Sequence, residues 1–354
     1  MASARFVSVD VLRGFDMVII LGVDVLAYRL AGAIQNPWTE GVASLFRHAE
    51  WVGFTPYDLV FPLFIFLAGV SIGLGEKTRG TSAPLKKAAR RAGIFLVLGV
   101  IYNFGWDWSP DRFRLPSVLF LIGMSGLAAT WVSVLTDSAR LRLAFAAGAL
   151  LILTGLQYAM PVPGFGPAVL TPEGSVNGWI DRWVLPGRLY GDTYDPEGVL
   201  SLLAGAAMAT SGLVVGRILA DAVTPRQAAM RLARGGGVAL VLGVAAAFFV
   251  PPIKKIWTLS FDLMAIGSSA LLLAACVLLF DGARVSSQRL SWITAVGANA
   301  IVAYMGSRFL IYPLTWQWSA ELNPWAGVAL VAVLLAVQMA LLQVLFRHQI
   351  FFRV

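Results

Sequence analysis

The segment "YDLVFPLFIFLAGVSIGLG" (residues 57–75) has one charged residue, Asp58, followed by an uncharged run from residue 59 to residue 75. A run of this length is typical of a helix that crosses a lipid bilayer, which needs roughly 17–25 residues. Lipid offers no hydrogen-bond partners, so the backbone must satisfy its own N–H and C=O groups. This stretch therefore predicts a transmembrane helix.

Comparable apolar segments recur along the whole chain. They lie at about 11–32, 88–104, 115–135, 140–160, 197–219, 236–252, 257–280, 291–313 and 325–346. The 354-residue chain is 58% hydrophobic and only 13% charged, with a mean hydropathy of +0.77, whereas a soluble domain carries roughly 25% charged residues. We predict an all-α polytopic membrane protein with about ten spanning helices and a single domain over residues 1–354.

The positive charges predict how the chain is oriented. One set of alternate connections, together with both termini, holds 18 of the 27 Lys and Arg residues, and the other connections hold 9. By the positive-inside rule the first set is cytoplasmic. Both termini are then cytoplasmic, and the long loops at about 33–55 and 161–196 are extracytoplasmic. The net charge of +8 follows from this topology and does not indicate nucleic-acid binding. We expect a multi-pass protein of a bacterial inner membrane.

The loop at 161–196 combines turn-forming residues with large side chains. Six of these side chains are aromatic or leucine, namely Trp179, Trp183, Leu185, Leu189, Tyr190 and Tyr194. We expect this loop to fold over the mouth of the helical bundle, as functional long loops do. No metal site is expected, because the chain has a single cysteine, Cys276, and its two histidines are far apart in the sequence.

The first predicted span contains ionisable residues, which are costly in a membrane and mark functional sites by default. Asp10 and Arg13 are three residues apart and can pair on one face of a helix, which makes Asp10 a structural candidate. Asp24 has no basic residue three or four positions before it. We expect Asp24 to face a functional site.

The connection before the second span carries His48, Trp51 and Asp58. Asp58 follows Pro56 at a helix start, a pattern typical of a capping carboxylate. His48 has no such structural role, and a neutral imidazole near pH 7 is the usual general base. Without further context, a passive loop histidine stays an open alternative.

Three later stretches add candidates. Asp195, Pro196 and Glu197 have the pattern of a cap and first turn at the sixth span. Lys254 lies on the side predicted to be poor in positive charge, which favours an anionic ligand or a carboxylate partner. Asn299 lies inside the ninth predicted span, where helix packing is the common role of an amide.

Together these stretches resemble the membrane-bound heparan-α-glucosaminide N-acetyltransferase family. The matching stretches are "SVDVLRGF" (8–15), "HAEWVGFTPYDLVFPLFIFLAGVSI" (48–72), "RLPSVLFLIG" (114–123), "IDRWVL…LYGDTYDPEGVL" (180–200), "FVPPIKKIWTLSF" (249–261), "GANAIVAYM" (297–305) and "IFFRV" (350–354). They follow the family's order over nearly the whole chain.

The resemblance implies acetyl transfer across the membrane, from cytoplasmic acetyl-CoA to an extracytoplasmic amino sugar or glycan, and it also implies a homodimer. The family's catalytic histidine matches His48. Its partner in the first span is an asparagine in the lysosomal enzymes, and Asp24 stands at that position here. We therefore predict His48 and Asp24 as catalytic residues, with Asp24 orienting the imidazole.

The remaining site residues are predicted by role. Candidates for binding acetyl-CoA are Arg5, Arg13, Arg114 and Lys254. The three arginines are candidates because a guanidinium binds phosphate bidentately, and Lys254 is also a candidate for binding the oxyanion or the acceptor. Candidates for binding the acceptor are Trp51, Asp195, Trp257 and Asn299. Asp10, Asp58 and Glu197 are expected to be structural or supporting residues.

The chain also departs from the family. Phe120 and Leu121 replace a common Gln-Arg pair, and Ser307 replaces a late histidine of the lysosomal enzymes. Two alternatives therefore stay open: a transporter of amino sugars or protons that uses the charges of the first span, and a degenerate relative that binds acetyl-CoA without transferring the acetyl group.

Overall fold

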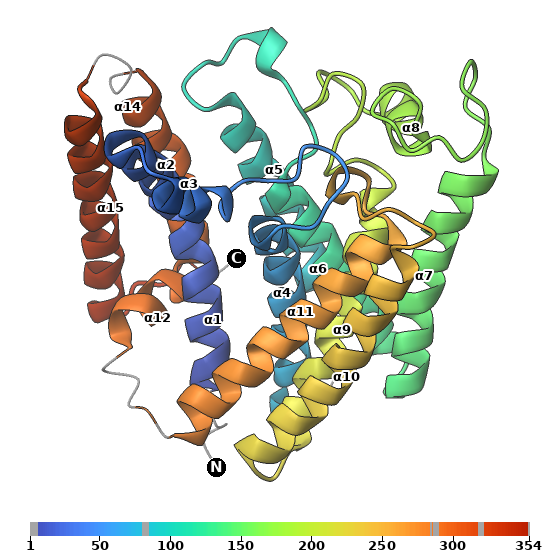
Figure 1. The fold of residues 1–354 in the computed structure, drawn as a ribbon. Helices are drawn as coiled ribbons and strands as arrows, with labels where there is room; N and C mark the ends of the chain where they lie inside the picture. Colours follow the sequence, from blue (N-terminus) through green and yellow to red (C-terminus); the bar gives the residue numbers. More distant parts are fainter. Residues whose placement is uncertain (1–5, 80–84, 284, 286–289, 318–321, 353–354) are drawn as a thin grey trace. The chain divides into compact units, whose positions relative to one another are not determined.

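The computed structural model describes residues 6–79, 85–283, 285, 290–317 and 322–352, which are helical and contain no β-strand (Figure 1). The chain forms two compact units. Unit 1 comprises residues 1–48, 55–60 and 275–354, and unit 2 comprises residues 49–54 and 61–274. The prediction of a single domain stays a prediction.

Eight helices in the described part of the chain are long and apolar enough to cross a membrane. They correspond to eight of the ten predicted spans, and the protein is an all-α polytopic membrane protein. The two remaining segments are also helical. Helix α5 (Leu85–Phe104) begins with a cluster of basic residues, and the segment predicted at 291–313 is broken into shorter helices.

Unit 1 contains the N-terminal and C-terminal helices. Its elements are α1 (Val7–Val18), a π-helical turn (Ile19–Val23), α2 (Asp24–Ile34), α3 (Pro37–Ser44), a 3₁₀ turn (Pro56–Leu59), a π-helical turn (Val277–Gly282), α12 (Ser291–Ala298), α13 (Ala300–Gly306), a π-helical turn (Ser307–Ile311), α14 (Tyr312–Gln317) and α15 (Pro324–Arg347). Helix α1 packs along α12, and α15 packs along α2 and α12.

The first predicted span is one apolar stretch, Val7–Ile34, with a π-helical turn in its middle. Gly22 in this turn has φ of 135°, a conformation that L side chains rarely adopt. Single π-helical turns within α-helices frequently occur at functional sites. The turn ends directly before Asp24, so the interruption sets the direction in which this carboxylate leaves the helix.

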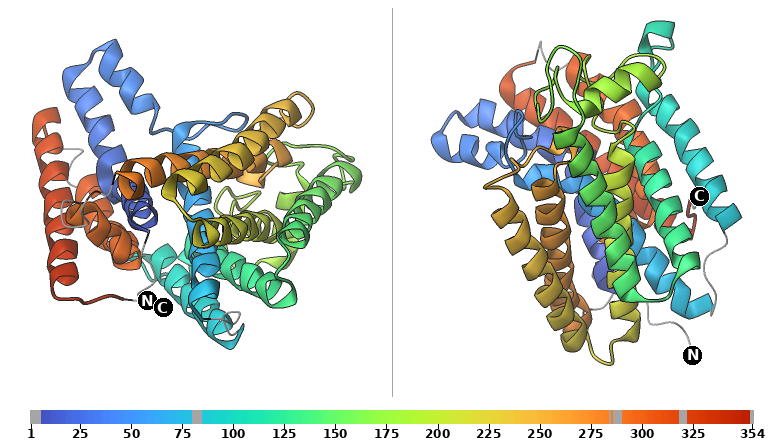
Figure 2. Two further views of the ribbon diagram at one scale, coloured as in Figure 1. Left: turned by 90° about the horizontal axis from the view of Figure 1, so that it is seen from below. Right: turned by 90° about the vertical axis from the view of Figure 1, so that its right-hand side faces the viewer.

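Unit 2 contains the middle of the chain. Its elements are α4 (Val60–Arg79), α5, a 3₁₀ turn (Pro110–Arg112), α6 (Val118–Leu135), α7 (Ala139–Ala159), α8 (Val176–Val184), α9 (Ser201–Asp221), α10 (Pro225–Ala246), a 3₁₀ turn (Lys254–Ile256) and α11 (Leu259–Cys276). Helix α9 packs against α6, α7 and α10, and it lies beside α6 and α7 in every view (Figures 1 and 2).

Helices α4 and α9 approach each other at glycine residues. A Cβ atom on Gly69 would overlap the carbonyl oxygen of Ala209, and one on Gly212 would overlap that of Phe66. Small residues at helix interfaces are the usual means of close packing in membranes, where no hydrophobic force drives helices together. This contact makes α9 a buried helix in the core of unit 2.

Both long loops contain a short helix, α3 in the first and α8 in the second. In each, a side chain caps the N-terminus: Asn36 accepts a hydrogen bond from Thr39, and Ser175 accepts one from Gly178. The prediction that Asp195 and Glu197 begin the sixth span is wrong, because α9 starts at Ser201. These two carboxylates have other partners, described below.

Candidate functional site

His48 is held by a carboxylate in unit 1. Its Nδ1 lies 2.7 Å from Oδ1 of Asp58. The Asp58 side chain is 1% exposed, whereas the His48 side chain is 47% exposed. A buried carboxylate beside an accessible imidazole fixes the ring orientation and places the proton of the neutral ring on Nδ1.

The turn that carries Asp58 explains its position. Thr55 and Asp58 form a capping box, in which the Thr55 hydroxyl accepts from the Asp58 backbone N–H and the Asp58 carboxylate accepts from the Thr55 backbone N–H. Pro56 occupies the first helical position. The predicted capping role of Asp58 is confirmed. One carboxylate oxygen makes the cap and the other contacts His48.

Tyr57 links His48 to the other predicted catalytic residue. The Tyr57 hydroxyl donates a hydrogen bond of 2.6 Å to Oδ2 of Asp24, and its ring centroid lies 4.5 Å from that of His48. The backbone N–H of Val25 also donates to Asp24. His48 and Asp24 are therefore part of one cluster. The prediction was that Asp24 orients the imidazole, but the carboxylate hydrogen-bonded to Nδ1 of His48 is that of Asp58.

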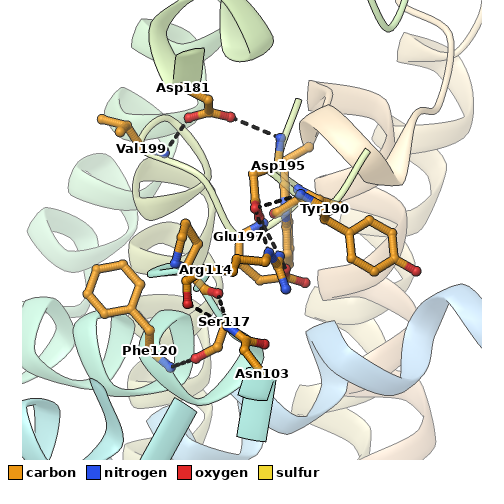
Figure 3. A network of polar contacts seen from close by, with 12 residues as sticks. Asn103, Arg114, Ser117, Phe120, Asp181, Tyr190, Asp195, Glu197 and Val199 are labelled. Atoms are coloured by element: carbon orange, nitrogen blue, oxygen red, sulfur yellow. Dashed lines mark hydrogen bonds and ion pairs between the residues drawn. The ribbon is translucent and has the colours of Figure 1, made fainter. Parts of the chain in front are cut away.

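A second polar cluster lies in unit 2, around Arg114 (Figure 3). The Arg114 guanidinium donates from Nε to Asp195 at 2.7 Å and from Nη2 to Asp195 at 2.5 Å, and Nη2 also donates to Glu197. All three side chains are buried. Burial alone would lower the pKa of Arg114, but the charges of Glu197 and Asp195 more than offset it and raise that pKa.

The loop before α9 is shaped by this cluster. Asp195 also accepts hydrogen bonds from the backbone N–H groups of Tyr190 and Glu197, and the Tyr190 ring lies over the guanidinium at 5.1 Å. Burial raises the pKa of Glu197, and the charge of Arg114 opposes that effect. Arg114 is thus paired with both Asp195 and Glu197 inside the protein, which favours a structural role for all three residues.

Asp181 on α8 fixes the same loop from the other side (Figure 3). Its buried carboxylate accepts hydrogen bonds from the backbone N–H groups of Asp195, at 3.2 Å, and Val199, at 2.9 Å. Burial raises the pKa of Asp181 to about 7, although these two hydrogen bonds oppose the shift. Burial thus favours the protonated form of Asp181 relative to an ordinary aspartate.

Aromatic and basic side chains gather near this loop in unit 2. Trp51 donates from Nε1 to the carbonyl of Leu170 at 2.7 Å and packs edge-on against Tyr194. The Lys255 ammonium lies 5.7 Å from the centre of the Trp51 ring. The Lys254 charge acts on Glu197. Trp51, through Tyr194, and Lys254, through Glu197, thus both lie near the loop that contains Asp195 and Glu197.

Two predicted acceptor residues are buried and hydrogen-bonded within the protein. Trp257 donates from Nε1 to the carbonyl of Pro196 and packs against Phe61 and Phe261. Asn299 lies between α12 and α13, donates to the carbonyl of Ile350 and accepts from the N–H of Phe352. Their predicted role in acceptor binding stays a prediction.

Asp10 and Arg13 form an ion pair on α1, as their spacing predicted, with 3.7 Å between Nη1 of Arg13 and Oδ1 of Asp10. Arg5 lies outside the described residues.

Comparison with characterised proteins identifies two relatives. Human heparan-alpha-glucosaminide N-acetyltransferase is 29% identical over 61% of this chain, and the mouse protein of the same name is 26% identical over 99% of it. The chain is similar to heparan-alpha-glucosaminide N-acetyltransferases. The resemblance drawn from the sequence motifs is confirmed. No family model matches the chain.

The match to the heparan-alpha-glucosaminide N-acetyltransferases covers only part of those proteins. It spans 38% of the human protein and 60% of the mouse protein. In the part matched by the mouse protein lie both clusters described above, since that match extends over nearly all of this chain.

Sequence reasoning missed several residues of these clusters. Tyr57 and Asp181 were not singled out, and the contact of Asp58 with His48 was not foreseen. A "T-P-Y-D" stretch is a recognisable capping box, which is a signal for Thr55 and Asp58 but not for the contact with a histidine ten residues earlier. Asp181 lies in "IDRWVL", where nothing in the local pattern indicates its two backbone donors.

Proposed function

We propose that this protein is a transmembrane acyltransferase that moves an acetyl group from cytoplasmic acetyl-CoA to an extracytoplasmic amino sugar or glycan. The observation that carries the proposal is the His48–Asp58 pair, in which a buried carboxylate orients an accessible imidazole. The similarity to the heparan-alpha-glucosaminide N-acetyltransferases supports the same reaction class.

In this proposal His48 is the general base. With Nδ1 hydrogen-bonded to Asp58, Nε2 is the basic nitrogen of the neutral ring and takes a proton from the acceptor. The acceptor nitrogen or oxygen bonds to the thioester carbonyl carbon, the C–S bond breaks, and His48 returns its proton to the departing thiolate. Asp58 stabilises the imidazolium formed in between. Transfer through a transient acetyl-imidazole on His48 fits the same pair.

Tyr57 and Asp24 support this base from its other side. The Tyr57 hydroxyl is fixed by Asp24, so the phenol ring is held beside the imidazole. We assign Tyr57 as a positioning residue that limits rotation of the His48 ring. Asp24, which stands where the lysosomal enzymes have an asparagine, keeps Tyr57 in place.

Acetyl-CoA carries phosphate groups that need cations. Among the predicted cations in the described residues, Arg13 is near Asp10, Arg114 is held by Asp195 and Glu197, and Lys254 is near Glu197. A phosphate at any of them competes with a carboxylate. Arg114, buried between two carboxylates, is the weakest candidate of the three.

The proposal is tested by acetyl transfer with the purified protein. Radiolabelled acetyl-CoA is supplied with a panel of amino sugars and glycans, and free thiol and labelled product are measured together. We expect equal amounts of thiol and acetylated product with at least one acceptor. Acetyl-CoA binding without thiol release across the panel contradicts the proposal and supports the degenerate relative.

A transporter is the second candidate, and one observation favours it. Asp262 on α11 is buried, and neither of its carboxylate oxygens has a hydrogen-bond partner in the described part of the chain. Buried carboxylates in membrane helices often serve proton or substrate movement. Uptake of labelled amino sugar by proteoliposomes, lost in Asp262→Asn and without acetylation, would support this function instead.

A further inference from the structure

A groove lies on the surface of unit 2 between α5 and α6. It has a volume of about 550 Å³ and is lined by Leu85, Lys86, Ala89, Met124, Leu127, Ala128 and Trp131. Except for Lys86, every lining side chain is apolar. None of these residues belongs to the clusters described above.

The packing of the two helices explains the hollow. At Gly123 the helices touch, and an added Cβ would lie 3.0 Å from Cα of Ala92. The groove lies beyond this contact, toward the start of α5 and the end of α6, where Ala89 and Ala128 are the small residues. Met124, Leu127, Ala128 and Trp131 are spaced as one face of a helix, and the Trp131 ring is held edge-on by Phe145.

Three cations lie in or next to the groove. Lys86 lines it, and Lys87 and Arg90 are exposed on the same first turns of α5. In the described part of the chain, none of these three cations is paired with a carboxylate within 4.0 Å. The positive-inside rule places this end of α5 at the cytoplasmic leaflet, where anionic lipids gather and attract nearby cations.

We propose that this groove binds an anionic phospholipid of the cytoplasmic leaflet, with its phosphate at Lys86 and the upper part of one acyl chain between α5 and α6. From Met124 to Trp131 the groove wall extends about 10 Å along the helix, at 1.5 Å per residue, which suits the upper part of an acyl chain. Trp131 lies in the last part of α6, and in this proposal it lies at the level of the headgroup, the usual place of tryptophan in a membrane protein. The site is independent of the proposed acetyl transfer.

The test is native mass spectrometry of the full-length protein in detergent. Phosphatidylglycerol, phosphatidylcholine and glycerol phosphate are added separately, and retained ligand is counted per protein. We expect phosphatidylglycerol to be retained at least fivefold more than phosphatidylcholine, and glycerol phosphate not at all. Equal retention of the two lipids, or retention of glycerol phosphate alone, overturns the proposal.

Variants locate the site. Lys86→Glu with Lys87→Glu repels the phosphate, and Ala128→Trp fills the groove, so each is expected to lower retention of phosphatidylglycerol at least fivefold. The control is Arg231→Glu with Arg234→Glu, an equal charge change at two exposed arginines of α10, and it should retain lipid like the wild type. If Ala128→Trp leaves lipid retention intact and instead changes the monomer–dimer ratio, the groove is a contact between copies and the lipid assignment is wrong.

Discussion

Asp58 serves two purposes with its two carboxylate oxygens. Oδ2 completes the capping box with Thr55, and Oδ1 contacts Nδ1 of His48. Sequence reasoning predicted the first, because capping depends on residues three apart. It did not predict the second, because the path of the chain between residues 48 and 58 decides which carboxylate the imidazole meets.

The Arg114 cluster shows the same limit more strongly. Arg114 and Asp195 are 81 residues apart in the sequence, and no local pattern indicates that they pair. The Asp-Pro-Glu stretch at 195–197 has the residue types of a helix start, but α9 begins only at Ser201. Asp195 and Glu197 instead pair with the buried Arg114 guanidinium, because an unpaired buried charge costs several kcal/mol.

We predict that Asp58→Asn lowers the rate of acetyl transfer 10- to 100-fold, because the amide no longer holds the imidazolium. The substitution also weakens the cap by about 1 kcal/mol. Thr55→Ala is the matched control, since it weakens the same cap and leaves the His48–Asp58 contact in place. Transfer rates and thermal unfolding of both variants should separate the two effects. A rate for Thr55→Ala as low as that of Asp58→Asn would show that the cap alone matters.

At the scale of elements, most spans could be predicted from apolar length. Interruptions within spans could not be. Asn299 lies at the break between α12 and α13, where its side chain is hydrogen-bonded to the C-terminal segment. Gly22, with its positive φ, lies in the π-helical turn that interrupts the first span. Hydropathy does not register either feature, since the residues around them are apolar.

The close contact between α4 and α9 leaves no room for a methyl group at Gly69. Gly69→Ala places a Cβ against the Ala209 carbonyl, and overpacking of this kind typically costs about 1–3 kcal/mol. Gly126→Ala on α6 is the control, because a Cβ there meets no atom within 4 Å. Thermal unfolding in detergent should show a lower melting temperature for Gly69→Ala and no loss for Gly126→Ala. Equal stability of the two variants would contradict the close packing.

Asn299 predicts the behaviour of the C-terminal segment. Asn299→Ala removes its hydrogen bonds to the backbone of Ile350 and Phe352, each of which contributes about 0.5–1.5 kcal/mol. We expect faster cleavage of this segment in limited proteolysis. Arg347→Ala, an exposed residue in the last turn of α15, should be cleaved at the wild-type rate. If both variants are cleaved alike, Asn299 does not hold the segment.

At the scale of the molecule, stability should depend on pH through Asp181. Its pKa is raised to about 7 from an ordinary 3.8, so the folded state favours the protonated acid. Its contribution to stability is full below about pH 4 and is lost as the pH rises to about 7, by an amount on the order of 4 kcal/mol. Asp181→Asn should reduce this slope of melting temperature against pH, whereas Asp111→Asn, at an exposed position, should not. An unchanged slope in Asp181→Asn would contradict the raised pKa.

Across the whole molecule, acetyl transfer is proposed to depend on one of only two histidines. The most direct test compares His48→Ala with His348→Ala, the matched control at the exposed end of α15, at saturating acetyl-CoA and acceptor. Loss of a general base typically costs roughly 10²–10⁴-fold in rate. We predict a loss of that size for His48→Ala and a wild-type rate for His348→Ala. A folded His48→Ala protein that binds acetyl-CoA and still transfers acetyl at the wild-type rate would contradict the proposal.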